Sequence, residues 1–253
     1  MERLRYIPTI EDDGPYQMAV DEAILRSYDE GNSPRTLRFF RFQPSTITMG
    51  YAQDVDDVID TSKCEELNIP YIRRITGGGT VFHDYEGEVT YSIVTNKMSG
   101  SIEDSFYHLL KPIIKTLQEY ELEARFKPYN DILVDGRKIS GSAQRRGRDG
   151  LLQHGTLMYA TDLEKLASIL ILDDKKMKDK GAESFLDLVT TMDDELGYRP
   201  DPDELIDDMK RKYKKYFGLE MYEDGLNERE KELIEEFKPK YGSESWTFDR
   251  DWK

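Results

Sequence analysis

Three consecutive glycines follow a pair of arginines in the first third of the chain, and the segment has the residue types of an anion-binding loop. Arg73 and Arg74 precede Gly77, Gly78 and Gly79. Consecutive glycines let backbone N–H groups converge on an anion, and a guanidinium supplies paired donors for phosphate or carboxylate. The spacing matches neither the Walker pattern nor the dinucleotide fingerprint. The segment predicts a phosphate cradle, and the alternative is a glycine turn beside surface arginines.

A lysine stands just past the tight turn of a predicted β-hairpin. Lys138 follows Asp135-Gly136, a strong hairpin signal, and the small residues Gly141, Ser142 and Ala143 come after it. Small neighbours leave room for a ligand, and an ammonium can act as a point charge between a carboxylate and a phosphate. The alternative is a solvent-facing strand lysine, because lysines are rarely buried.

Other polar residues near these segments are candidates for metal binding or pocket lining. Asp131 could hold a metal or position a water, or it is a turn residue before a strand. His154 could contact a nucleotide, and His83 follows the glycine loop, although both fit structural roles equally well. Three scattered histidines and one cysteine disfavour a zinc site.

The composition excludes several classes of protein. The chain has 36 Lys+Arg against 51 Asp+Glu, a formal net charge of -15, which disfavours nucleic acid and anionic membranes as partners. No apolar stretch of about 18 residues predicts a membrane span, and the charged first residues do not resemble a secretory signal. One cysteine, Cys64, forms no disulfide framework. We therefore expect a cytoplasmic protein.

The hydrophobic periodicity predicts one α+β domain over residues 1–253, with a mostly antiparallel sheet flanked by helices and a helical C-terminal part from about residue 173. Helices are expected at 15–29, 60–67, 101–120, from 162, around 205–217 and at 228–237. Strands are expected at 35–42, 45–51, 70–74, 88–95, 132–134, 137–139 and 151–159. In the helix at 101–120, Ser101 is the expected cap and Pro112 the expected kink.

Taken together and in this order, the motifs resemble the lipoate-protein ligase A family, whose catalytic fold is shared with biotin protein ligases. The matching strings are MAVDEAIL, RRITGGGTVFHD, NDILVDGRKISGSAQRR, LLQHGTL and a weaker KYGSESW. The resemblance implies an ATP-dependent ligase, which activates lipoate to lipoyl-AMP and transfers the lipoyl group to a lysine of an acceptor protein. It also implies Mg²⁺ with the ATP and no tightly bound organic cofactor.

The resemblance implies roles for the residues at matching motif positions of this chain. Lys138 would stabilise charge at the acyl carboxyl and the α-phosphate, and Asp131 would bind Mg²⁺. The implied ATP and lipoyl-adenylate site comprises Arg74, Thr76, Gly77, Gly78, Gly79, Thr80, Val81, Phe82, His83, Asn130, Asp131, Lys138, Gly141, Ser142, Ala143 and His154. Residues 177–191 sit where family members have a mobile loop over the adenylate.

The expected partners follow from this chemistry. The resemblance implies lipoyl domains of 2-oxoacid dehydrogenase E2 subunits and the glycine-cleavage H protein as acceptors. It is closest to the short form of the family, which works with a separate accessory protein. Because acceptors of this kind are often acidic, we expect the cluster Arg145, Arg146 and Arg148 to be the docking patch.

Two alternatives stay open. The first is an octanoyl or lipoyl transferase that uses a thioester on cysteine. The ligase is favoured over it because Cys64 lies outside the motifs and residues 126–130, where such transferases carry their cysteine, contain none. The second is a non-catalytic lipoate- or biotin-binding module, which the presence of Arg74 and Lys138 disfavours.

Overall fold

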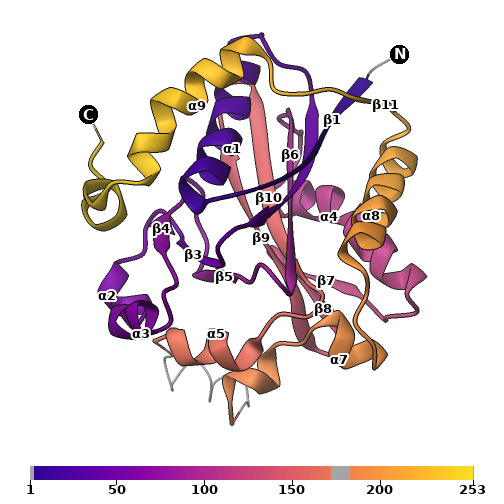
Figure 1. Cartoon of the computed structure of the whole chain (residues 1–253). Helices are drawn as coiled ribbons and strands as arrows, with labels where there is room; N and C mark the ends of the chain where they lie inside the picture. The colour runs from indigo at the N-terminus through magenta and orange to yellow at the C-terminus, as the bar shows by residue number, and fades with distance from the viewer. Residues whose placement is uncertain (1–2, 172–182, 253) are drawn as a thin grey trace.

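The computed structural model describes residues 3–171 and 183–252 and has a large mixed sheet at its centre (Figure 1). Its strands are β1 (Arg3–Asp12), β2 (Thr36–Phe42), β6 (Glu88–Asn96), β7 (Arg125–Lys127), β8 (Asp131–Val134), β9 (Arg137–Arg146), β10 (Gly150–Met158) and β11 (Glu220–Glu223). They lie in the order β11-β1-β2-β6-β10-β9-β8-β7. Only β1 runs parallel to its neighbours, and the other pairings are antiparallel. The predicted α+β class is confirmed.

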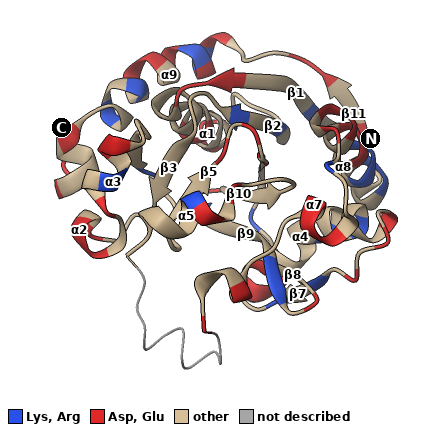
Figure 2. Cartoon of the chain, turned by 60° about the horizontal axis from the view of Figure 1, so that its bottom comes forward, with Lys and Arg blue, Asp and Glu red and all other residues tan. Residues whose placement is uncertain are grey.

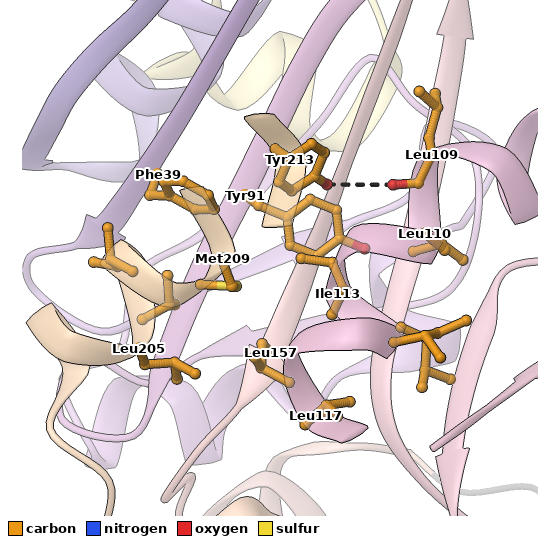
Figure 3. Close-up of a cluster of buried hydrophobic side chains, with 14 of the residues drawn as sticks. Phe39, Tyr91, Leu109, Leu110, Ile113, Leu117, Leu157, Leu205, Met209 and Tyr213 are labelled. Atoms are coloured by element: carbon orange, nitrogen blue, oxygen red, sulfur yellow. Dashed lines mark hydrogen bonds between the residues drawn. The ribbon is translucent and has the colours of Figure 1, made fainter. Parts of the chain in front are cut away.

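Helices cover both faces of this sheet (Figure 1). One face carries α1 (Gly14–Asp29) and α9 (Glu228–Tyr241), which pack on each other, and the opposite face carries α4 (Ile102–Glu119) and α8 (Pro202–Phe217). Figure 3 shows the second interface, where Phe39 and Tyr91 from the sheet meet leucines of α4 and Tyr213 of α8. The buried Tyr213 hydroxyl donates to the Leu109 carbonyl at 3.3 Å, so its polar end is satisfied.

A smaller sheet holds the glycine loop. It consists of β3 (Thr46–Met49), β4 (Tyr71–Arg73) and β5 (Val81–His83), in the order β4-β3-β5. The loop at 74–80 leaves the end of β4 and enters β5, so both of its ends are fixed to β3. The short helices α2 (Val55–Val58), α3 (Thr61–Glu66) and α5 (Leu163–Ile169) contribute to the separate apolar core beneath this sheet.

Two local sequence signals form the structures that they predict. Ser101 caps α4 in a capping box with Asp104, and the helix continues through Pro112. Asp135 and Gly136 have φ of 46° and 82°, the paired positive values that a two-residue hairpin turn requires between β8 and β9. The turn fixes the register of β9, and with it the position of Lys138.

Three strands of the large sheet, β1, β7 and β11, were not predicted, and neither was β5 of the small sheet. Residues 3–12 form β1 despite Pro8, because the pairing with β2 shifts register between Ile7 and Ile10 and needs no ladder hydrogen bond from the proline. The C-terminal part also adds β11 beside β1.

The remaining elements are η1 (Phe185–Leu188), α7 (Met192–Leu196) and η2 (Ser245–Asp249). Of the loop expected at 177–191, residues 177–182 lie outside the described residues, whereas Val189 forms a bridge with Lys138. No helix in the described ranges is long and apolar enough to cross a membrane.

Candidate active site

The glycine loop and the β8–β9 hairpin meet at a pocket. Its walls come from both sheets and from α1, and most of the predicted site residues line it. The lining residues are Met18, Thr48, Arg74, Gly78, Gly79, Thr80, Val81, His83, Thr90, Asn130, Lys138, Gly141, Ser142, Ala143, His154, Gly155 and Thr156. Of the predicted residues, Thr76, Gly77, Phe82 and Asp131 do not line it. The ligand contacts themselves stay predictions.

Arg74 shapes the glycine loop from inside. Its buried guanidinium donates to the carbonyls of Gly77 and Gly79, both at 2.7 Å, and to the Thr48 carbonyl at 2.9 Å. These acceptors are uncharged, so they leave the positive charge without a neutralising partner. Burial lowers the pKa of Arg74 to about 10, which keeps the guanidinium protonated at neutral pH. The loop therefore carries a buried cation suited to an anionic group.

Arg73 has a structural role. Its guanidinium donates to the carbonyls of Trp246 at 3.2 Å and Thr247 at 2.6 Å, and the Trp246 indole donates to the Arg73 carbonyl at 2.8 Å. These contacts attach η2 to β4 at the base of the glycine loop. The KYGSESW segment therefore anchors the strand from which the glycine loop begins.

Gly50 allows the glycine loop to approach β3. A Cβ at this position would lie 2.0 Å from the Gly78 carbonyl oxygen, so no other residue fits without moving the loop. Gly78 itself has a φ of +93°, which favours glycine. Gly50 was not among the predicted site residues, although a glycine directly after a strand is a known signal for close backbone approach.

Lys138 lies on the hairpin side of the pocket. Its Nζ is 2.8 Å from Asp131 Oδ1, an ion-pair distance without the alignment of a directed hydrogen bond, and 39% of its side chain is exposed. A Cβ at Gly141 would lie 2.7 Å from that Nζ, so the glycine provides the surface along which the lysine lies. The Thr190 amide donates to the Lys138 carbonyl at 2.9 Å and fixes the backbone.

Asp131 is a weak candidate for the predicted Mg²⁺ site. Within residues 3–171 and 183–252, no group of three or more His, Cys, Asp or Glu side chains could hold a metal ion. Its carboxylate is already engaged with Lys138. The structure gives Asp131 the role of a counter-charge, and the Mg²⁺ site stays a prediction.

His83 belongs to a buried polar group at the pocket wall. Its Nε2 is 3.0 Å from Thr48 Oγ1, its Nδ1 is 3.2 Å from Glu88 Oε2, and its ring stacks on Phe42 with centroids 3.9 Å apart. Burial lowers the pKa of His83 and raises the pKa of Glu88 well above its usual range. Burial therefore favours the neutral forms of both groups.

The shift of Glu88 makes a testable prediction for stability. Because the folded-state pKa of Glu88 is raised, its stabilising contribution is present at low pH and is lost as the pH rises above the unfolded value of 4.5. Glu88→Gln cannot ionise, so the free energy of unfolding should increase relative to wild type, and more at pH 8 than at pH 5. Urea denaturation at pH 5 and pH 8 measures the free energy of unfolding of wild type and Glu88→Gln. The variant Glu236→Gln, at an exposed position, is the control. An equal effect of Glu88→Gln at both pH values would contradict the assignment.

Cys64 lies away from the pocket. It is buried in the apolar core beneath the small sheet, with Ile47 and Ile59. Burial, with Asp60 nearby, raises the pKa of the thiol to about 11, which disfavours the nucleophilic thiolate. The prediction that Cys64 is a structural thiol agrees with this position.

The three arginines of the expected docking patch differ in their surroundings. Arg145 and Arg146 are exposed at the end of β9, and Arg146 donates to Ser105 Oγ at 3.1 Å. Arg148 forms an ion pair with Asp149 at 2.8 Å, so its charge is partly balanced. Elsewhere acidic residues are prominent on α2 and α7, whereas α9 carries both signs (Figure 2). Docking at Arg145, Arg146 and Arg148 stays a prediction.

Comparison with known proteins decides the family. The model of the lipoyl protein ligase A/B catalytic domain matches residues 13–214. The chain belongs to the lipoyl protein ligase A/B family. Octanoyltransferase LipM of Clostridioides difficile is 30% identical, with 99% of this chain and 100% of the relative covered. LipM of Moorella thermoacetica is 31% identical over 92% of this chain and 93% of its own.

Solved structures show the same fold. A bi-partite lipoate protein ligase from Thermoplasma acidophilum, described with its E2 lipoyl domain, is 28% identical with a TM-score of 0.87, covering 100% of this chain and 98% of that chain. A lipoate-protein ligase A bound with ATP is 25% identical with a TM-score of 0.83, covering 97% and 98%. These neighbours confirm the catalytic-domain fold, and the protein is an enzyme of the lipoate and octanoate attachment family.

The prediction of an ATP-dependent lipoate ligase is wrong. Octanoyltransferase relatives match nearly the whole chain at 29–31% identity and favour the transferase alternative, whereas the solved ligase structures share its fold. The prediction relied on the lack of a cysteine near residues 126–130. That lack argues only against a covalent cysteine intermediate, because a cation and backbone N–H groups can assist attack on an acyl phosphate and on a thioester alike.

Proposed function

We propose that the protein transfers an octanoyl group from a thioester carrier to the lysine of a lipoyl domain. The observation that carries the proposal is the position of Lys138, whose ammonium lies along Gly141 in the pocket that the glycine loop also lines. An ammonium at this place can stabilise negative charge on an acyl oxygen. The octanoyltransferase relatives, similar over nearly the full chain, support the choice of acyl group.

The chemistry requires one nucleophilic substitution at a carbonyl carbon. The acceptor amine nitrogen attacks the thioester carbonyl, the C–N bond forms, the C–S bond breaks, and the amine proton leaves with the thiolate to give a free thiol. Negative charge develops on the carbonyl oxygen before the C–S bond breaks. Lys138 is placed to stabilise this charge, an effect worth about 100- to 1000-fold in rate for one such donor.

The acyl group passes directly from donor to acceptor in this proposal. Cys64 is the one cysteine of the chain, and its burial outside the pocket leaves no thiol to form an acyl-enzyme there. The pocket instead serves to hold the two reactants in line, which alone supplies a large part of many enzymatic accelerations.

This proposal predicts that Cys64→Ala keeps its activity. We expect octanoyl transfer within about 2-fold of wild type and a loss of about 1 kcal/mol in the free energy of unfolding, because a small buried side chain is removed. Initial rates of acceptor octanoylation and urea denaturation measure the two quantities. A large loss of transfer by a folded Cys64→Ala protein would show that the thiol takes part in catalysis.

The proposed partners and co-substrates follow from the acyl donor. The acceptors are lipoyl domains of E2 subunits and the H protein, an idea supported by the E2 lipoyl domain described with the Thermoplasma acidophilum neighbour. A thioester is already activated, so the transfer requires no ATP or Mg²⁺. The separate accessory protein stays a prediction.

The donor is tested by comparing two reaction mixtures. Purified protein and a lipoyl domain are incubated with octanoyl-acyl carrier protein alone, or with octanoate, ATP and Mg²⁺. The proposal expects octanoylated lipoyl domain from the thioester. Product formed only from octanoate with ATP would overturn it.

A further inference from the structure

A chain of buried hydrogen bonds connects the first helix to the glycine loop. It begins at Asp21 in α1, passes through His154 in β10 and Thr76, and ends at Arg74. His154 Nδ1 is 2.7 Å from Asp21 Oδ2, His154 Nε2 is 2.8 Å from Thr76 Oγ1, and Arg74 Nε donates to Thr76 Oγ1 at 2.9 Å. All four side chains are at most 6% exposed, so water does not compete strongly for these bonds.

Asp21 is held in its ionised form. Its Oδ1 accepts from Arg38 Nε at 2.9 Å, from Arg38 Nη2 at 2.7 Å and from Ser92 Oγ at 2.8 Å. Burial raises the pKa of Asp21, but Arg38 and the hydrogen bonds from His154 and Ser92 lower it by a larger amount. The resulting pKa is about 2. An ionised carboxylate can only accept hydrogen bonds. The proton between Asp21 Oδ2 and His154 Nδ1 must therefore lie on Nδ1.

The proton on Nδ1 fixes which atom donates and which accepts in every hydrogen bond from Asp21 to Arg74. In a neutral imidazole with Nδ1 protonated, Nε2 is an acceptor. The Thr76 hydroxyl then donates to Nε2 while its oxygen accepts from Arg74 Nε. Every donor and acceptor along the chain is matched, from the guanidinium to the carboxylate.

The end of this chain controls the geometry of the loop. The guanidinium of Arg74 is planar, so the hydrogen bond from its Nε to Thr76 sets the plane in which its Nη2 reaches the carbonyls of Gly77 and Gly79. Turning the guanidinium out of that plane would release both carbonyls. The loop conformation therefore depends on the Thr76 hydroxyl being held by His154.

We propose that Asp21 is a positioning residue, which fixes the tautomer of His154 and, through Thr76, the orientation of Arg74 and the glycine loop. Asp21 does not line the pocket, so it acts on substrate only through the other residues. The inference rests on the proposed function for its kinetic consequences, but not for the tautomer. A purely structural Asp21, which joins α1 to β2 through Arg38, is the competing role.

A double-mutant cycle separates the two roles. Asp21→Asn and Thr76→Val each interrupt the chain, and Thr76→Ser, which keeps the hydroxyl, is the matched control. We expect each interrupting variant to lower kcat for octanoyl transfer by about 10- to 100-fold, and the double variant to be no slower than the slower single variant, since residues acting as a unit are non-additive. Thr76→Ser should recover most of the kcat that Thr76→Val loses, because it restores the hydroxyl. Effects of the two variants that multiply in full would overturn the proposal.

The ring nitrogens of His154 give a readout that does not depend on activity. In ¹⁵N NMR of the wild-type protein, we expect the His154 proton on Nδ1, with the signal assigned by its loss in His154→Gln among the three histidines of the chain. In Asp21→Asn the amide nitrogen faces the ring, so the proton should move to Nε2. A wild-type ring protonated on Nε2 alone would overturn the proposal even if Asp21→Asn fails to fold. A wild-type protein without octanoyl transfer but with the Nδ1 proton would contradict the proposed function and leave the tautomer assignment standing.

Discussion

Replacing Lys138 with alanine is expected to slow octanoyl transfer by about 100-fold or more. The ammonium is the cationic side chain of the hairpin wall, and its Nζ lies 2.8 Å from Asp131 rather than in bulk solvent. Removing it takes away a pre-positioned charge at the developing oxyanion, and the loss of one such donor costs about 100- to 1000-fold. The loss should fall on kcat, because the charge develops only in the transition state.

Initial rates of acceptor octanoylation over a range of thioester concentrations separate kcat from KM. Lys115→Ala is the matched control, because Lys115 is exposed on α4, outside the pocket. It should transfer at the wild-type rate. A folded Lys138→Ala protein that keeps its kcat would remove Lys138 from the proposed chemistry.

Gly50→Ala is expected to have an effect of similar size without changing any charge. The added Cβ would meet the Gly78 carbonyl oxygen at 2.0 Å. The Cβ is fixed to its Cα and the oxygen belongs to the backbone, so neither atom can rotate away. The loop must move, and a displacement of about 1 Å can cost about 100-fold in rate. Overpacking should also lower the free energy of unfolding by about 1–3 kcal/mol.

Gly225→Ala is the control for Gly50→Ala, because a Cβ at Gly225 has no neighbour within 4 Å. Octanoyl transfer rates, urea denaturation and amide exchange of residues 77–79 compare the two variants. We expect faster exchange in the loop of Gly50→Ala alone. Wild-type rates and exchange in Gly50→Ala would show that the loop tolerates the displacement.

The elements with strong local signals were predictable from sequence. The capping box of α4 and the Asp135-Gly136 turn act within a few residues, so their outcome depends little on the rest of the chain. The strand β1 was missed because its stability comes from β2 and β11, which are distant in sequence. Periodicity cannot reveal a pairing with residues more than 200 positions away.

The same limit applies to the site. Arg74 and Lys138 stood out because arginine beside glycines and lysine after a turn are unusual locally. Thr48 and Thr90 are ordinary strand residues, and only the folding of the two sheets brings them to the pocket wall. Arg73 carries the same local signal as Arg74, yet its partners are carbonyls of η2 and of the segment that follows β3. The direction of the side chain distinguishes Arg73 from Arg74, and the sequence does not reveal that direction.

The acyl donor was the hardest property to predict. The motifs specify a fold and a pocket lined by a glycine loop and by the cationic side chains Arg74 and Lys138. These groups assist acyl transfer from an adenylate and from a thioester by the same electrostatic means. The residues therefore identified the family, and comparison with near-full-length relatives was needed to correct the reaction.

The central claim is direct octanoyl transfer from a thioester to a lipoyl-domain lysine, and intact mass spectrometry of a single mixture tests it. The protein is mixed with octanoyl-acyl carrier protein and a lipoyl domain in the absence of ATP. The account predicts that the lipoyl domain gains one octanoyl group, lost when its acceptor lysine is replaced by arginine, while the enzyme keeps its unmodified mass throughout. An unmodified lipoyl domain, or an octanoylated enzyme that forms before the product, would contradict it.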